Sequence, residues 1–389
     1  MENLTQRLQA LLDRAVAEQE FAGMNLLVRR GGEELAYVQA GYADAERGVP
    51  FSRDTIARMY SMTKPVTAAA AMLLVERGQL DLGQSVSEFL PGFRDQTVWQ
   101  QGERVPVRRD VQVKDLLNMT SGLSYPGDDE AGREAGAVFH QADQALYGSA
   151  PMDTLELANR LGRCSLAFQP GERWMYGTSA DVLGAVIQQV SGLRFGEFLR
   201  RELFAPLGME DTGFYVPEKQ RHRLAQVYEQ AEGKLLPYPT NNLDIRYTQD
   251  VSPAFESGGA GLVSTIDDYA KFAQMLLNGG QLAGVRVMQP GTVDFLTHGQ
   301  LTPWQLDSMW RSWDGLAGYG YGNLMRVMEQ PGMALCNPWP GEYGWDGWLG
   351  TYFCNSPANG VTVLLLCQRR DTGTSSVTRK IRNVLTACL

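Results

Sequence analysis

Residues 59–72 read MYSMTKPVTAAAAM. Pro65 fits the first turn of a helix, where its missing N–H costs no hydrogen bond, and the alanines extend this helix to about Arg77. Ser61 and Lys64 then lie three residues apart on one helical face, within contact distance. The positive end of the helix and partial burial both disfavour an ammonium group, so we expect a lowered pKa for Lys64.

A neutral amine beside a hydroxyl group is a general base beside a nucleophile. The backbone N–H of Ser61 would also point toward an oxyanion that forms during attack. The ordinary alternative is that Ser61 caps a helix and Lys64 is a solvated lysine. S-x-x-K occurs nowhere else in the chain, and two further stretches supply groups that favour the catalytic interpretation.

The first of these stretches is PGERWMYGTSADVLGAVIQQVSG, residues 170–192, which places Tyr176 just before a predicted helix. Thr178 to Asp181 matches the [ST]-x-x-[DE] capping pattern. A tyrosine fixed at the start of a helix can reach across a cleft and relay a proton beside an amine. A lone tyrosine is more often a core or surface residue, so this hypothesis depends on the Ser61–Lys64 pair.

The second stretch is GEYGWDGWLGTYFCNSP, residues 341–357, with glycines at 341, 344, 347 and 350. We expect an edge strand whose accessible N–H groups supply a second oxyanion donor and a platform for an extended acyl group. The alternative is an aromatic-rich hairpin that packs on the core.

Composition narrows the class of protein. The 389 residues are 44% hydrophobic and 20% charged, as in ordinary globular domains. A net charge of -9 argues against nucleic acid or an anionic membrane as partner, because both need clustered Lys and Arg. The N-terminus lacks the features of a signal peptide, and no stretch approaches the roughly 18 apolar residues of a membrane helix. We therefore expect a cytoplasmic protein.

Metal and cofactor motifs are absent from the sequence. The five cysteines are scattered without C-x-x-C spacing, which indicates reduced thiols and neither disulfides nor a metal site. The three histidines lie far apart, and H-E-x-x-H, G-x-S-x-G, P-loop and dinucleotide fingerprints do not occur. We expect an enzyme that uses no metal and no cofactor.

Hydrophobic patterns at the two ends of the chain predict one shared sheet. Strand-like runs flank Gly31-Gly32 and Asn359-Gly360, as in hairpins. Helices are predicted over residues 3–19 and near the C-terminus, because apolar residues recur at helical spacing: Leu4, Leu8, Leu11, Leu12 and Ala15, and Val377, Ile381, Val384 and Leu385. The ends are expected to form an antiparallel sheet covered by both helices.

The middle of the chain is mainly helical by pattern, with loop or lid segments predicted over residues 126–150 and 214–255. The predicted fold class is mixed α/β (α+β), a single unit of two parts. Residues 1–60 and 253–389 form an α/β subdomain, and residues 61–252 form the inserted helical subdomain. A site at their junction is expected, since pockets favour such junctions.

Together the three stretches resemble the signature of the serine β-lactamase and penicillin-binding-protein superfamily: S-x-x-K, a tyrosine-based second box and a glycine-bearing third box. The likeness is closer to class C β-lactamases and family VIII carboxylesterases. It covers nearly the entire chain and includes LLNMTSGLSY, FAPLGMEDTGF and GGAGLVSTIDDYAKFAQMLLNGG. The resemblance implies a β-lactamase-like fold and an acyl-enzyme mechanism.

The resemblance also implies roles for the matching residues. Ser61 would be the nucleophile and Lys64 its base. Tyr176 would protonate the leaving group and later activate water. The backbone N–H groups of Ser61 and Trp348 would form the oxyanion hole.

Two boxes depart from the pattern. Trp345-Asp346-Gly347 replaces the Lys-Thr-Gly or His-Thr-Gly of β-lactamases, and losing that charge-assisted bond to a substrate carboxylate removes roughly 1.5–3 kcal/mol, or about one to two decades of binding. Family VIII esterases often have Trp-Gly-Gly here, so Trp345 favours an esterase. In the second box, Thr178 replaces an asparagine and can donate only one hydrogen bond.

The predicted substrate-binding residues are Tyr125, Thr178, Trp345, Asp346 and Gly347. With Trp348 and Trp174 nearby, these aromatic side chains favour apolar acyl or alcohol groups. The predicted function is a carboxylesterase that acts on small esters, with weak or no β-lactamase activity. Alternatives are a β-lactamase or D-amino-acid peptidase or amidase, an acyltransferase like the related lovastatin-pathway enzyme, and a non-catalytic binding or assembly protein. The partner expected is a small-molecule ester or amide.

Overall fold

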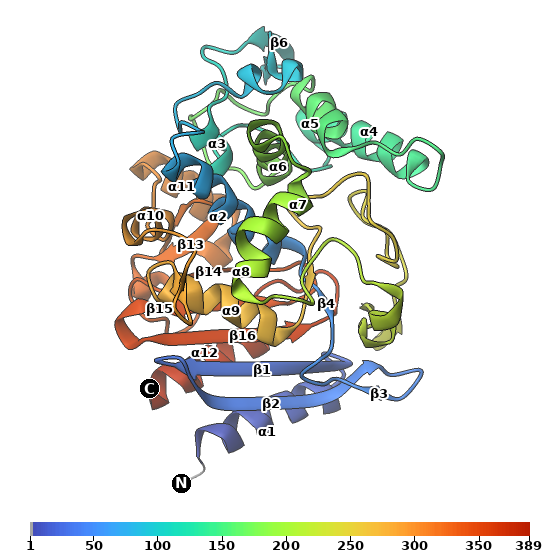
Figure 1. Ribbon diagram of the computed structural model, residues 1–389, viewed down its shortest axis with the longest axis vertical. Coiled ribbons are helices and arrows are strands. Elements are labelled where there is room, and N and C mark those ends of the chain that lie inside the picture. Colours follow the sequence, from blue (N-terminus) through green and yellow to red (C-terminus); the bar gives the residue numbers. More distant parts are fainter. Residues whose placement is uncertain (1–2) are drawn as a thin grey trace.

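The structure is a computed structural model that describes residues 3–389. Its centre is an eight-stranded antiparallel sheet with the strand order β12-β13-β14-β15-β16-β1-β2-β3 (Figure 1). These strands are β1 (Gly23–Arg30), β2 (Glu33–Asp44), β3 (Val49–Pro50), β12 (Tyr319–Gly322), β13 (Met325–Met328), β14 (Tyr343–Asp346), β15 (Tyr352–Ser356) and β16 (Val361–Cys367).

Shorter strands form two-stranded pairs outside this sheet: β4 (Ala57–Arg58) with β9 (Val263–Ser264), β5 (Thr97–Gln100) with β6 (Glu103–Pro106), β7 (Tyr228–Ala231) with β8 (Lys234–Pro237), and β10 (Gln281–Leu282) with β11 (Val285–Arg286). The α-helices are α1 (Leu4–Ala17), α2 (Thr63–Glu76), α3 (Val113–Leu117), α4 (Glu130–Ala145), α5 (Thr154–Gly162), α6 (Ser179–Ser191), α7 (Phe195–Leu199), α8 (Ala205–Leu207), α9 (Ile266–Leu277), α10 (Pro290–Leu296), α11 (Pro303–Ser312) and α12 (Ser376–Cys388).

The two ends of the chain share the sheet, as the sequence predicts. β1 lies between β2 and β16, and Leu26 and Leu27 pair with Leu365 and Leu364. Side chains alternate between the two faces of a strand. Leu26 and Leu365 therefore join the core under α1 and α12, whereas Leu27 and Leu364 join the larger core on the opposite face. Figure 1 shows α1 and α12 on the same side of this sheet, with the two chain ends close together.

The alanine run explains the place of α2 in the fold. Ala68, Ala69, Ala70 and Ala71 are all fully buried, and α2 packs against α6 and approaches β14. Small side chains let neighbouring elements approach closely, and protein interiors are packed to high density. The sequence therefore places α2 in the interior, with Lys64 buried in its first turn.

The prediction of a loop over residues 126–150 is wrong for most of this range, because the helix α4 occupies its centre. Asp129 caps this helix by accepting a hydrogen bond from the N–H of Gly132 at 2.6 Å. Ala131, Ala135, Val138, Phe139 and Ala142 recur at helical spacing and are buried. Their periodicity outweighs the Gly and acidic residues on which the loop interpretation relied.

The segment over residues 214–255 is only partly irregular. It holds a 3₁₀ turn, Glu218–Arg223, and the β7–β8 hairpin, while residues 238–255 contain no helix or strand. The division of the chain into subdomains at 60/61 and 252/253 remains a prediction.

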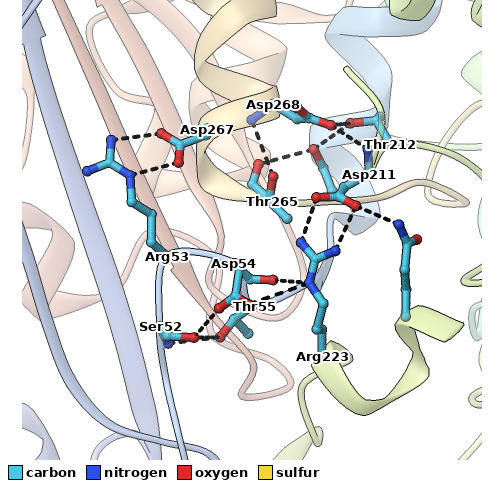
Figure 2. Close-up of polar contacts among 12 residues, drawn as sticks. Ser52, Arg53, Asp54, Thr55, Asp211, Thr212, Arg223, Thr265, Asp267 and Asp268 are labelled. Carbon is cyan, nitrogen blue, oxygen red and sulfur yellow. Dashed lines mark hydrogen bonds and ion pairs between the residues drawn. The ribbon is translucent and has the colours of Figure 1, made fainter. Parts of the chain in front are cut away.

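Polar contacts fix the chain just before it reaches Ser61 (Figure 2). Arg53 pairs with Asp267 near the start of α9 at 2.7 Å. Arg223 pairs with Asp211 at 2.6 Å and donates to the carbonyl oxygen of Asp54 at 2.8 Å. Bidentate arginine–carboxylate pairs define orientation as well as distance. They therefore hold the segment that runs through β4 to the serine.

Across residues 3–389, no helix combines the length and the apolar character that a bilayer crossing requires. In the same range no three His, Cys, Asp or Glu side chains gather closely enough to hold a metal ion. All five cysteines are free thiols.

Candidate active site

Ser61 lies in a single 3₁₀ turn, Tyr60–Met62, that leads directly into α2. The regular helix thus begins two residues later than Ser61, and Pro65 is within its first turn. Tyr60 has a φ of 44°, a left-handed conformation that is uncommon for a large side chain. Its ring packs against Trp348 with centroids 5.0 Å apart. Such strain clusters at functional sites, where the surrounding packing maintains it.

Lys64 is completely buried and contacts three oxygen atoms. Its Nζ lies 3.1 Å from Ser61 Oγ, 3.0 Å from Tyr125 OH and 2.9 Å from the carbonyl oxygen of Gly259. A carbonyl can only accept, so one N–H of a neutral amine points to Gly259 and another can point to Tyr125. The lone pair of the amine then faces Ser61, whose hydroxyl can donate to it.

The surroundings of Lys64 favour its neutral form. Burial lowers the pKa of Lys64 to about 7, although Asp181 and Asp346 oppose this shift. The Nζ also lies 4.6 Å from the centre of the Tyr176 ring, where the aromatic face would stabilise a proton taken up during reaction. The amine can therefore exchange a proton near neutral pH.

Tyr176 stands beside the same pair of residues. Burial raises the pKa of Tyr176, while hydrogen bonds with Ser61 and Trp345 act in the opposite direction. The indole Nε1 of Trp345 donates to Tyr176 OH at 3.1 Å, and Trp345 is fully buried. Trp345 therefore lies buried beside Tyr176 and donates to its hydroxyl group, and its contact with substrate stays a prediction.

The edge strand expected at residues 341–357 is observed only in part, because the Trp345–Asp346 end of β14 pairs with β15 alone. β14 has neighbours on both sides, since it pairs with β15 over its length and with β13 at Tyr343 and Gly344. A tight turn follows, in which the N–H of Gly347 donates to the carbonyl of Thr351 at 2.7 Å. The N–H of Trp348 lies in that turn. Within the described part of the chain, it donates no hydrogen bond.

The remaining residues of the third box, Asp346 and Gly347, line a pocket that also contains Ser61, and both have local structural constraints. Asp346 is buried and pairs with Arg326 at 3.3 Å, and it also accepts from the Thr374 hydroxyl. A Cβ on Gly347 would lie 2.5 Å from the carbonyl oxygen of Met59, so glycine is required there. Asp346 is thus held in an ion pair with Arg326, and substrate binding by Asp346 and Gly347 stays a prediction.

Thr178 differs from expectation in two respects. It occupies the N-cap position of α6, but its side chain makes no capping hydrogen bond. Its hydroxyl lies 3.4 Å from the carbonyl oxygen of Ser124, and the side chain is fully buried. Gly177 allows this close approach, because a Cβ there would lie 1.9 Å from the carbonyl oxygen of Leu123. Thr178 lines neither of the two pockets that contain Ser61, and its contact with substrate stays a prediction.

The sequence interpretation missed a second layer of polar groups. Asp181 accepts from Ser257 Oγ at 2.5 Å and from the N–H of Gly259 at 3.0 Å. Gly259 therefore links Asp181, through its N–H, to Lys64, through its carbonyl oxygen. Asp181 lies in the supposed capping pattern and Gly259 in a quoted family segment, but nothing in their spacing indicates this contact.

Two pockets meet at Ser61, and Ser61, Tyr176 and Trp348 line both of them. The α12 pocket, about 350 Å³, extends past Trp313 and Leu316 to Thr374 and Arg379. The α4 pocket, about 540 Å³, lies between the helix α4 and residues 241–244, and Tyr125 lines it. Trp174 is buried and stacks on Tyr176, 6.2 Å between centroids, without lining either pocket.

Comparisons with known proteins agree with this architecture. Protein Rv1367c of Mycobacterium tuberculosis is 33% identical over 86% of this chain and 83% of its own length. Esterase EstB of Burkholderia gladioli is 31% identical over 96% of this chain and 92% of its own. The solved structure of EstCE1, described as a hydrolase with promiscuous acyltransferase activity, matches with a TM-score of 0.82, 25% identity and 98% coverage of both chains.

These matches confirm the predicted fold class, an α/β fold with a large antiparallel sheet and flanking helices. A family model described as Beta-lactamase matches residues 8–387. Since that match extends over almost all of the sequence, the chain belongs to the Beta-lactamase family.

Proposed function

We propose that the protein is a serine hydrolase that forms an acyl-enzyme on Ser61 and acts mainly as a carboxylesterase on small or apolar esters. The observation that carries this proposal is the fully buried Lys64 amine, 3.1 Å from the Ser61 hydroxyl and held by neutral partners. EstB and EstCE1, an esterase and a hydrolase, support the reaction class.

In the first half of the proposed reaction, neutral Lys64 removes the proton of Ser61 as Oγ attacks the ester carbonyl carbon. The developing oxyanion would accept from the backbone N–H groups of Ser61 and Trp348. The C–O bond of the ester then breaks, and Tyr176 gives its proton to the departing alkoxide. Lys64 then passes to Tyr176 the proton that it took from Ser61. The result is an acyl-enzyme and a neutral alcohol.

In the second half, a water molecule attacks the acyl carbon. Tyr176, assisted by Lys64, would remove a proton from this water, and the same proton passes to Ser61 Oγ when the acyl–oxygen bond breaks. The products are a carboxylic acid and the original enzyme.

Weak activity on β-lactams follows from the third box. Trp345 occupies the cation position of β-lactamases, and Arg326, whose guanidinium lies 5.5 Å from the Trp345 ring centre, is paired with Asp346. The α12 pocket retains Arg379, which donates to the carbonyl of Thr374 at 3.1 Å, so charged lactams belong among the test substrates.

Acyl transfer is a second candidate, favoured by the two pockets that meet at Ser61. One pocket can hold the acyl group while an acceptor alcohol replaces water in the other. EstCE1 is described as having both activities.

The activity should rise with pH through about 7. Lys64 must be neutral to act as a base, and burial lowers its pKa to about 7. Below that pH the ammonium form predominates and kcat/KM should fall about tenfold per pH unit. A pH profile of kcat/KM with a neutral ester tests this prediction, and a profile that stays flat between pH 5 and 9 would contradict it.

The decisive test is intact-mass analysis of the protein after brief exposure to 4-nitrophenyl esters, penicillin, a cephalosporin and a D-amino-acid amide. We expect one acyl group per chain from the esters, located by peptide mapping on the peptide that contains Ser61. Acylation elsewhere would exclude the proposed nucleophile. Faster turnover of the charged cephalosporin than of uncharged esters would exclude the esterase assignment.

A further inference from the structure

The α4 pocket has one aspartate in each of two opposite walls. On α4, Gly136, Phe139, His140 and Asp143 recur at spacings of three, one and three residues, so one helical face lines the pocket. The opposite wall is the irregular segment 241–244, which ends in Asp244. The two segments on which the sequence suggested loops or lids thus form the two walls beside Ser61.

Asp244 is an unusual carboxylate for such a wall. It is 3% exposed, and its Oδ1 is buried without a hydrogen-bond partner among the described residues. Leu243 and Asp244 both adopt left-handed backbone conformations, with φ values of 53° and 59°, which place this side chain in the wall at a conformational cost. Asp244 lines the pocket, and no described residue donates a hydrogen bond to its carboxylate, so a cation or donor held beside it in the pocket would be favoured.

Neighbouring cations do not satisfy Asp244. Arg246 donates to the carbonyl of Leu146 at 2.7 Å and lies 4.6 Å from the centre of the Tyr147 ring. Arg194, which shares an adjoining cavity with Asp244, pairs with Glu256 at 3.0 Å. The residues that line the α4 pocket itself include no arginine or lysine.

The rest of the pocket suits an organic cation. Tyr60, Phe139 and Trp348 line it, and aromatic rings attract quaternary and primary ammonium groups. Burial raises the pKa of Asp244 to about 7, Asp143 raises it further and Arg246 opposes the shift. A bound cation would favour the ionised form of this carboxyl group.

We propose that the α4 pocket recognises an ammonium group of the substrate, so that the preferred esters carry a cationic amine in the acyl or alcohol part. This inference rests on the proposed function, because it places the cation within reach of a reaction at Ser61. Asp244 is the main anion in this recognition and Asp143, at the exposed rim, is an auxiliary one.

The test uses two pairs of esters that match in shape but differ in charge. One pair is acetylcholine and 3,3-dimethylbutyl acetate, with the cation in the alcohol part. The other is the phenyl esters of 4-(trimethylammonio)butanoate and 5,5-dimethylhexanoate, with the cation in the acyl part. In at least one pair, we expect the wild type to favour the cationic ester by about tenfold or more in kcat/KM.

Asp244→Asn should lower kcat/KM for the cationic ester far more than for its matched neutral ester, and so remove most of that preference. Asp143→Asn should have the same effect in smaller degree. Asp13→Asn makes the same change at an exposed position on α1 and is the control. Equal rates for both members of each pair in the wild type would overturn the inference while leaving the esterase proposal intact. An equal loss on charged and neutral esters in Asp244→Asn would assign it a structural role and also overturn the inference.

If no ester is hydrolysed, the proposed function fails, and binding decides the inference separately. Calorimetric titration with phenyltrimethylammonium should then show binding to the wild type that is at least about tenfold weaker in Asp244→Asn. Equal binding to both proteins, or none to the wild type, would overturn the inference.

Discussion

Ser61→Ala is expected to lower kcat/KM for a neutral 4-nitrophenyl ester by about a thousandfold or more and to abolish acyl labelling. The hydroxyl groups that remain near Lys64 belong to Tyr125 and Tyr176, and burial raises the pKa of both well above its ordinary value. Neither phenol is therefore an effective nucleophile near neutral pH.

Ser149→Ala is the matched control, because it makes the same change at an exposed position. It should retain wild-type activity and labelling. A Ser61→Ala protein that keeps its melting temperature and hydrolyses esters at even a tenth of the wild-type rate would contradict the proposed mechanism.

Lys64→Met is expected to reduce kcat/KM by about 10²–10⁴-fold, because the variant lacks the general base. Methionine has a similar length and suits a buried position, so the fold should persist. The residual activity should also lose the rise with pH near 7, since the group that titrates there is gone. Steady-state kinetics across pH, with thermal melting as a folding check, measures both effects.

Lys114→Met provides the comparison at an exposed lysine on α3 and should change neither the rate nor the pH profile. If Lys64→Met kept the pH dependence of the wild type, another group would be responsible for it. Near-normal turnover in this variant would refute the base assigned to Lys64.

The framework of the fold was predictable because its signals are local. The helical periodicity from Leu4 to Ala15 and the turn at Gly31-Gly32 each depend on a few neighbouring residues. The S-x-x-K spacing likewise fixes Ser61 and Lys64 on one turn of chain. The helix α4 was missed because glycine and acidic residues obscured a periodic apolar face that only packing makes decisive.

Contacts between distant parts of the chain were less predictable. The sequence suggested Trp345 as a substrate contact but did not indicate the hydrogen bond from its indole to Tyr176. Tyr125 was expected to bind substrate and also contacts Lys64, at 3.0 Å. The Asp181–Gly259–Lys64 chain joins three separate elements, so no single stretch of sequence could indicate it.

The pairing of β1 with β16 has a consequence for biosynthesis. Met24 and Cys367 are partners in the sheet, so β1 lacks one of its two neighbours until residue 367 has left the ribosome. Pairings between residues so far apart in sequence form slowly, because a long loop must close first. A nascent chain that stalls before β16 would expose one edge of β1 and invite association with other chains. Completion of the C-terminal strand should therefore be the step at which this protein commits to its native state.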